Sequence, residues 1–153
     1  MKDIVIKMLK DRGVNLLDIA KLVYDLQIKY GPLTMDDCLY SINKVLEKRE
    51  VQHAILTGVV LDIYAEKNLL PEPLLDILKR DEPLYGIDEV LALSITNVYG
   101  TIGLTSFGYL DKEKLGILKD LNDPKNGVHT FLDDLVAGIA AAASARIAHS
   151  KKH

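Results

Sequence analysis

The chain has 153 residues, of which 48% are hydrophobic and 27% are charged, and its formal net charge is −3. These values are typical of one globular domain. Because acidic and basic residues are nearly balanced, no basic stripe is available to neutralise phosphates, which argues against nucleic acid as the main partner. The single cysteine, Cys38, excludes an internal disulfide and is compatible with a reducing cytoplasm. We interpret Cys38 as a small buried hydrophobic residue.

The N-terminal residues lack the long apolar stretch of a signal peptide. Residues 90–110 contain no Asp, Glu, Lys or Arg and are long enough to span a bilayer, but serine, threonine, asparagine and glycine interrupt them. We therefore expect a cytoplasmic protein whose contact with a membrane is at most peripheral, at the inner membrane face.

Five helices are predicted in the first eighty residues from apolar periodicity and from signals at their ends. Asn15 caps the second helix, and Gly31-Pro32 ends it. Thr34, with Asp37 three residues later, gives a start similar to a capping box for the third helix. The predicted helices cover residues 3–11, 15–30, 34–46, 50–67 and 71–78.

The segment Ile87–Tyr99 is apolar on nearly all faces, which is typical of a helix enclosed by others. Residues 100–126 are punctuated by glycine and are predicted to mix loop with a short helix near 112–121. Thr130 caps a last helix that runs to about His149. The side chains of this last helix are mostly small, so we expect it to pack closely against Ile87–Tyr99.

The predicted fold class is therefore all-α, a multihelical single domain over residues 1–153. Ile87–Tyr99 is predicted to be its central apolar helix, with about five other helices around it. An amphipathic all-α chain often hides a remaining face in a dimer or tetramer, so we expect a homo-oligomer.

Two acidic pairs, Asp88-Glu89 and Asp133-Asp134, open two of these nearly charge-free segments. A carboxylate in the first turn is favourable simply because it lies at a helix N-terminus, but a cap needs only one and each segment has two. Neighbouring helix residues point about 100° apart, so one member of each pair would bind a cation while the other orients water or a lysine. Such oxygen ligands suit Mg²⁺, with Ca²⁺ or Mn²⁺ as substitutes.

Other polar residues have weaker claims to a site. Asp62 and Glu66 lie one turn apart on a predicted helix, a spacing that indicates solvated helix surface. Asp111 and Lys114 belong to a charge run that is usually exposed, although a lysine near a metal-bound phosphate would stabilise its charge. His129 precedes the last helix, and we interpret it as a support for the cap rather than as a phosphate ligand.

Four segments follow one another in a characteristic order. They are the helix of Asp62 with its closing Ala-x-Lys, the Asp88-Glu89 pair, the Asp-x-x-Lys segment ending at Lys114, and Asn126-Gly127 followed by the Asp-Asp-x-x-Ala-Gly sequence of residues 133–138. In this order they resemble the phosphatidylglycerophosphatase A family of bacterial lipid phosphatases. The resemblance covers about residues 53–145. Residues 1–50 diverge from the family's N-terminal phosphate motif and first membrane-spanning segment, so the chain is similar to a short, water-soluble branch.

The resemblance implies Mg²⁺-dependent hydrolysis of a phosphomonoester, phosphatidylglycerophosphate, to phosphatidylglycerol and phosphate. The partner would then be a phosphorylated small molecule or a lipid headgroup, and either water or an aspartate would be the nucleophile. The catalytic and metal-binding set implied by the resemblance is Asp88, Glu89, Asp133 and Asp134, with Asp62 supporting the metal and Lys114 facing the phosphate. The alternative is a non-catalytic, self-associating helical interaction protein descended from a lipid phosphatase.

Overall fold

The computed structural model describes residues 1–150, except for the side chains of residues 101 and 102. All regular structure in this part of the chain is helical, which confirms the predicted all-α fold. Short 3₁₀ turns follow α2 and α6 and precede α9. The α-helices are α1 (Lys2–Asp11), α2 (Leu16–Gln27), α3 (Met35–Val45), α4 (Arg49–Glu66), α5 (Leu74–Lys79), α6 (Ile87–Thr96), α7 (Thr101–Glu113), α8 (Ile117–Leu121) and α9 (Leu132–Ser150).

The helices of the N-terminal half begin where local end signals predicted them. At the start of α3, the Thr34 hydroxyl accepts the N–H of Asp37 at 3.1 Å, and the Asp37 carboxylate accepts the N–H of Thr34 at 3.0 Å. At the start of α2, the N–H of Asn15 donates to the Asp18 carboxylate at 2.9 Å. These bonds satisfy backbone amides that a helix leaves without an internal partner, so the caps act locally.

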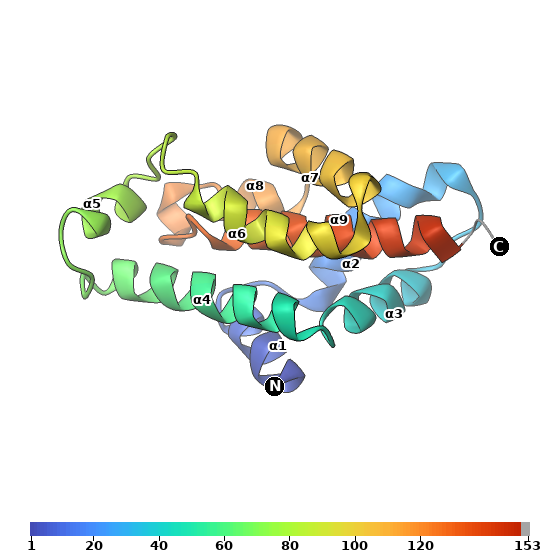
Figure 1. Cartoon of the computed structure of the whole chain (residues 1–153), viewed down its shortest axis with the longest axis horizontal. Coiled ribbons are helices and arrows are strands. Elements are labelled where there is room, and N and C mark those ends of the chain that lie inside the picture. Colours follow the sequence, from blue (N-terminus) through green and yellow to red (C-terminus); the bar gives the residue numbers. More distant parts are fainter. Residues whose placement is uncertain (151–153) are drawn as a thin grey trace.

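The central helix is α9, which packs against α2, α3, α4, α6, α7 and α8. Every residue from Leu132 to Ala145 is buried, whereas α6 buries only three of its residues. In Figure 1, α9 (red) runs along the long axis of the molecule, with α6 (yellow) beside it. The prediction of one central apolar helix is confirmed, but the choice of Ile87–Tyr99 as that helix is wrong.

Side-chain size explains why α9 rather than α6 is enclosed. A Cβ atom added at Gly138 would lie 3.0 Å from the carbonyl oxygen of Ala92, so the α6 backbone lies directly against this part of α9. On the opposite side of α6, Ile87 and Val90 are 52% and 62% exposed. Apolar residues are common on protein surfaces, so the apolar character of a helix does not by itself place the helix inside.

Residues 100–126 contain more helix than was predicted. The helix α7 runs through Gly103 and Gly108 and ends at Glu113, and the next residue, Lys114, has a φ of +50°. The predicted helix over 112–121 is therefore wrong, since it spans the break between α7 and α8. A Cβ atom at Gly103 would lie 3.0 Å from the carbonyl oxygen of Thr96, so this glycine permits a close contact inside a helix.

The first amides of α9 are capped by a carboxylate from α4. The Asp62 side chain accepts the N–H of Phe131 at 3.0 Å and the N–H of Leu132 at 2.9 Å. The hydroxyl of Thr130 instead donates to the carbonyl oxygen of Leu78 at 2.6 Å, so the predicted Thr130 cap is wrong. Asp62 is fully buried, which also corrects its interpretation as solvated helix surface.

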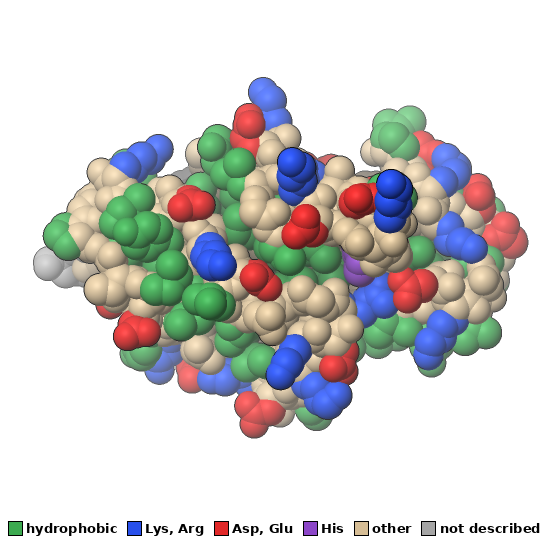
Figure 2. Space-filling model, turned by 180° about the vertical axis from the view of Figure 1, so that it is seen from behind, with side chains coloured by type: hydrophobic (Ala, Val, Ile, Leu, Met, Phe, Trp, Pro, Cys, Tyr) green, Lys and Arg blue, Asp and Glu red, His purple; other side chains and the backbone are tan. Residues whose placement is uncertain are grey.

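The molecular surface mixes the two signs of charge, and acidic and basic side chains alternate over the face shown in Figure 2. Leu84, in the loop that precedes α6, is 91% exposed. Cys38 is fully buried, as predicted. Within residues 1–150, no helix combines the length and the apolar character needed to cross a bilayer.

Candidate active site

The two acidic pairs meet near the start of the central helix. Asp88 and Glu89 lie in the first turn of α6, and Asp133 and Asp134 lie in the first turn of α9. These helices pack along one another, and the Asp134 carboxyl is within hydrogen-bonding contact of Asp88. The fold therefore brings together two pairs that are far apart in the sequence. Their function as metal ligands and catalytic groups stays a prediction.

A lysine ammonium lies among these carboxylates. The Nζ atom of Lys114 donates to Asp133 Oδ2 at 2.9 Å and to Asp111 Oδ1 at 3.1 Å, and it lies 4.0 Å from Asp134 Oδ1. Burial works against a charged lysine, but the Asp133 and Asp111 carboxylates outweigh it and raise the pKa of Lys114. Lys114 is therefore a fixed positive charge at the end of α7.

The two aspartates of α9 are nearly inaccessible, with side-chain exposures of 7% for Asp133 and 5% for Asp134. Burial raises the pKa of Asp133, although the Lys114 ammonium opposes this effect. Burial also raises the pKa of Asp134, and the neighbouring Asp133 charge adds to the shift. One ammonium does not offset this many carboxylates, so the cluster can accept further positive charge.

Two more carboxylates, Asp81 and Asp111, lie near the acidic pairs. Loss of hydration raises the pKa values of Asp81 and Glu89, with Asp88 and Asp111 adding negative charge nearby. Sequence reasoning interpreted Asp111 as exposed, although its i, i+3 spacing from Lys114 on one helix was a usable signal. It missed Asp81 entirely, because this residue stands in an ordinary charge run at residues 79–82.

Asp62 lies close to the cluster but acts on the backbone. Burial raises the pKa of Asp62 to about 7, against the lowering effect of the Phe131 and Leu132 amides. By holding these amides, Asp62 fixes the first turn of α9, in which Asp133 and Asp134 follow immediately. The predicted contribution of Asp62 to metal binding stays a prediction.

Arg12, which follows α1, ties the loop before α9 to the rest of the fold. Its guanidinium donates to Glu66 Oε2 at 3.1 Å and to the Val128 carbonyl at 2.7 Å, and it lies 3.4 Å from Nδ1 of His129. Because arginine only donates, Nδ1 of His129 accepts, and Nε2 donates to the Asn126 carbonyl at 2.7 Å. His129 thus contacts Arg12 and the loop before α9 through its two ring nitrogens, and its interpretation as a support for the cap stays a prediction. Arg12 gave no sequence signal, since its partners are far along the chain.

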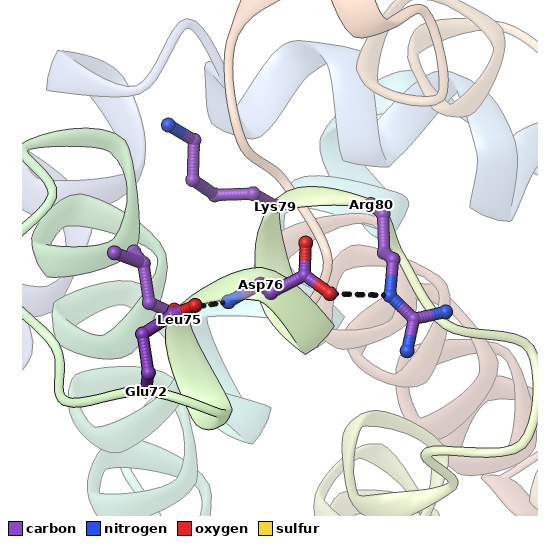
Figure 3. A pocket seen from close by; sticks show the side chains of 5 residues that line it. All are labelled: Glu72, Leu75, Asp76, Lys79 and Arg80. Carbon is purple, nitrogen blue, oxygen red and sulfur yellow. Dashed lines mark hydrogen bonds and ion pairs between the residues drawn. The ribbon is translucent and has the colours of Figure 1, made fainter.

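A cavity of about 520 Å³ opens beside the carboxylates, between the end of α5 and the segment that leads into α9. Asp81 and Asp133 line it, and Lys79 and Arg80 contribute from α5 and the residue after it. A second hollow, of about 360 Å³, shares these two basic residues and is shown in Figure 3 with its lining: Glu72, Leu75, Asp76, Lys79 and Arg80. Only the larger cavity includes carboxylates of the candidate site.

Among residues 1–150, no group of three or more His, Cys, Asp and Glu side chains is already arranged to hold a metal ion. The Lys114 ammonium instead contacts Asp111 and Asp133. The donor set nevertheless fits Mg²⁺, which takes carboxylate oxygen and water as ligands. The buried Asp133 and Asp134 carboxyls have raised pKa values, and a bound cation would favour their ionised forms.

The fold and the site define an all-α protein with a carboxylate–lysine site at the start of its central helix. A family model described as phosphatidylglycerophosphatase A matches residues 7–149, and the chain belongs to this family. The match begins well before residue 53, where the motif resemblance began, so the N-terminal helices are also covered by the family pattern.

Similar proteins share this architecture over nearly their full length. The chain is 59% identical to the uncharacterized protein YpjQ of Bacillus subtilis (strain 168), over 98% of this chain and 85% of that protein. It is 60% identical to the uncharacterized protein YutG of the same organism, over 95% and 89%. The solved structure of the low temperature requirement C protein from Listeria monocytogenes superposes with a TM-score of 0.96 at 54% identity, covering 99% of this chain and 97% of that one. A protein of unknown function from Bacillus stearothermophilus gives a TM-score of 0.96 at 56% identity, covering 98% and 94%.

Proposed function

We propose that the chain is a Mg²⁺-dependent phosphomonoester hydrolase that converts phosphatidylglycerophosphate to phosphatidylglycerol and phosphate. One observation carries this proposal: the carboxyl groups of Asp88, Asp133 and Asp134 lie close together, with the Lys114 ammonium beside Asp133 and Asp134. The chain also belongs to the phosphatidylglycerophosphatase A family. We further propose that the protein works in the cytoplasm and meets the lipid headgroup at the inner membrane face.

In this proposal Asp88, Glu89, Asp133 and Asp134 hold the cation, with Asp62 supporting. When bound, Mg²⁺ neutralises phosphoryl charge and makes the phosphorus more susceptible to attack. Asp111, which contacts Lys114, is a further candidate ligand.

The residues of the chain have separate tasks in the reaction. Lys114 donates N–H bonds to phosphoryl oxygens, where negative charge builds up in the transition state. Asp62 holds the first turn of α9, so that Asp133 and Asp134 keep their positions. The bond between phosphorus and the glycerol oxygen breaks as an oxygen of water, or of an aspartate, bonds to phosphorus. On the aspartate route water then hydrolyses the acyl phosphate, and on either route the proton that water loses balances the proton that the glycerol oxygen gains.

Release of phosphate from phosphatidylglycerophosphate in detergent micelles tests this function. We expect turnover with Mg²⁺, none above background in EDTA, and a loss of about 10²–10³-fold in Asp133→Asn, which removes one charge from the site. Asp25→Asn is the matched control, since Asp25 is an exposed acid on α2. Equal phosphate release by wild type and Asp133→Asn, with or without Mg²⁺, would instead favour the non-catalytic interaction protein.

A further inference from the structure

The loop before α9 forms one wall of the cavity beside Asp133. Residues 127–130 all line this cavity, together with Asp133 in the first turn of the helix. Residues 127–131 are not helical, so the hydrogen bonds of a helix do not fix their positions. Contacts with other segments must therefore hold this wall in place.

The side chains of Arg12 and Glu66 hold both backbone groups of Val128. The Arg12 guanidinium donates to the Val128 carbonyl at 2.7 Å, and Glu66 Oε1 accepts the Val128 N–H at 3.0 Å. The same guanidinium donates to both carboxylate oxygens of Glu66, at 3.1 and 3.2 Å. A bidentate ion pair thus encloses one residue of the loop. Arg12 follows α1, which packs against α4 (Figure 1), and its side chain is only 12% exposed.

The residue before Val128 fits closely against this ion pair. Gly127 has a φ of +108°, in the left-handed region that favours glycine. A Cβ atom at this position would overlap Glu66 Oε1. The loop backbone therefore lies directly against the Glu66 carboxylate, and displacing that carboxylate would displace the loop.

A short series of bonds leads from Val128 to the carboxylates of the candidate site. The carbonyl of His129, the residue after Val128, accepts the N–H of Asp133 at 3.3 Å. The Asp133 carboxylate in turn accepts a bond from the Lys114 ammonium at 2.9 Å. A shift of Val128 would therefore move the His129 carbonyl and, with it, the amide of Asp133.

We infer that Arg12 and Glu66 are positioning residues of the candidate active site. The pair fixes Val128 and thereby sets the place of Asp133, so both residues act through the loop and neither is a catalytic residue. Their effect on turnover rests on the proposed function. Arg12 lies outside residues 53–145, so α1 becomes part of the framework of the site although it carries none of the family motifs.

Arg12→Lys tests the role of the guanidinium. Lysine keeps the positive charge but lacks the planar fork that reaches Glu66 and the Val128 carbonyl together. With phosphatidylglycerophosphate in detergent micelles, kcat should fall about 10–100-fold and KM should stay nearly unchanged, because a misplaced group slows the chemical step. The Kd for Mg²⁺ from calorimetric titration should rise about tenfold, since the support of a metal ligand is weakened. Arg49→Lys, at an exposed position of α4, is the matched control and should change neither constant.

Gly127→Ala disturbs the same contact without changing a charge. The added Cβ atom would displace the Glu66 carboxylate, so kcat should fall and the Kd for Mg²⁺ should rise as in Arg12→Lys. Gly100→Ala is the matched control. Gly100 has a similar backbone conformation, with φ +81° and ψ −160° against φ +108° and ψ −169°, but a Cβ atom there meets nothing within 4 Å. Equal effects of the two substitutions would contradict the positioning role.

Amide hydrogen exchange distinguishes positioning from a general loss of stability. In Arg12→Lys the amides of Val128 and Asp133 should exchange about tenfold faster than in wild type, whereas the amides of α3 should not change. Faster exchange throughout the protein would overturn the inference. Unchanged kcat and Mg²⁺ affinity in Arg12→Lys would overturn it as well.

The Mg²⁺ titration requires no turnover, so it separates this inference from the proposed function. If wild type released no phosphate, the proposed function would be removed, but a Kd for Mg²⁺ about tenfold higher in Arg12→Lys would still support the positioning role. If wild type bound no Mg²⁺, both would be overturned.

Discussion

At the scale of single residues, the carboxylate of Asp62 connects the fold to the site. It is fully buried, and its oxygens accept the N–H groups of Phe131 and Leu132 at the start of α9. A helix N-terminus inside a protein leaves amides that need acceptors. Local groups accept the N–H groups of Asp133 and Asp134, but the acceptor for Phe131 and Leu132 comes from α4. The same bonds fix the turn that carries Asp133 and Asp134, so a single side chain contributes both to stability and to the placement of the site.

Asp62→Ala is expected to lower the free energy of unfolding by about 2–4 kcal/mol, because each buried donor left without an acceptor costs about 1–3 kcal/mol. Asp62→Asn keeps one acceptor oxygen and should cost less. Urea unfolding at pH 7 measures both variants. Asp25→Ala, the exposed control, should stay within about 0.5 kcal/mol of wild type. If Asp62→Ala were as stable as Asp25→Ala, the bonds from Asp62 to the first amides of α9 would contribute nothing to the free energy of unfolding.

Lys114 should have opposite effects on metal affinity and on turnover. Lys114→Gln removes a positive charge beside Asp133 and Asp111, so Mg²⁺ should bind about tenfold more tightly to this variant. The same change should lower kcat by about 10²–10³-fold, because a donor to the phosphoryl oxygens is lost. Calorimetric titration with Mg²⁺ and a phosphate-release assay measure the two effects. Lys112→Gln, at an exposed position of α7, should change neither, and weaker Mg²⁺ binding in Lys114→Gln would contradict the assigned geometry.

At the scale of helices, the close contact between α6 and α9 depends on the absence of side chains. Gly138 of α9 faces the backbone of Ala92 in α6. Gly58 of α4 faces the side chains of Leu135 in α9 and of Phe131, which precedes α9. These contacts set the distances at which the first turns of α6 and α9 meet. The site carboxylates of those turns therefore depend on glycines that lie outside the site.

Gly138→Val is expected to destabilise the protein by about 1–3 kcal/mol, because the added atoms cannot fit against the Ala92 carbonyl without moving a helix. Gly108→Val is the matched control on α7, where an added Cβ atom meets nothing within 4 Å. Thermal and urea unfolding of the two variants provide the comparison. Equal stability of Gly138→Val and Gly108→Val would show that the helices are not in the close contact described.

Local sequence patterns predict where the helices begin, but they do not predict which helix is central. Caps and periodicity placed α1 to α5 correctly, because a cap and the residue it holds are only three positions apart. The same reasoning chose Ile87–Tyr99 as the central helix on its apolar character, and α9 is central instead. Which apolar helix is enclosed depends on how closely the neighbouring helices can approach it. That distance depends on the side chains of both helices in each pair, so the sequence of one helix does not reveal it.

At the scale of the whole molecule, the distribution of charge affects stability and cation binding more than the net charge does. The formal net charge is −3, but acidic side chains are concentrated around Lys114 and partly removed from water. Burial raises the pKa values of Asp62, Asp133 and Asp134, so the folded state retains protons that an unfolded chain would lose. Protons and a divalent cation are then alternative ways to neutralise the site.

The free energy of unfolding of the metal-free protein is therefore expected to rise as the pH falls from 8 to 5. For each buried aspartate, the stabilisation is fully present below the unfolded pKa of 3.8 and is lost as the pH rises through the raised folded value, which is about 7 for Asp62. The expected slope is about 1.4 kcal/mol per pH unit for each proton retained. His129, whose pKa burial lowers, acts in the opposite direction but is a single group.

Urea unfolding at pH 5, 6, 7 and 8 in EDTA measures this dependence. Asp134→Asn should flatten it, since one retained proton is removed, whereas Asp25→Asn should not. Saturating Mg²⁺ should stabilise the protein more at pH 8 than at pH 5, because the cation binds the ionised carboxylates. Stability that falls steadily from pH 8 to pH 5 in EDTA would contradict the raised pKa values.

Features that act over a few residues could be predicted from the amino-acid sequence alone: the all-α class, the capped helices of the N-terminal half, the two acidic pairs and the order of motifs that indicated the family. The reason is that helical periodicity and capping bonds join positions three or four residues apart. Helix packing was needed to see that α9 is enclosed, that Asp62 caps it, and that Asp81 and Asp111 lie beside the acidic pairs. These features arise from contacts between segments that are distant in the chain, and helix packing sets their distances.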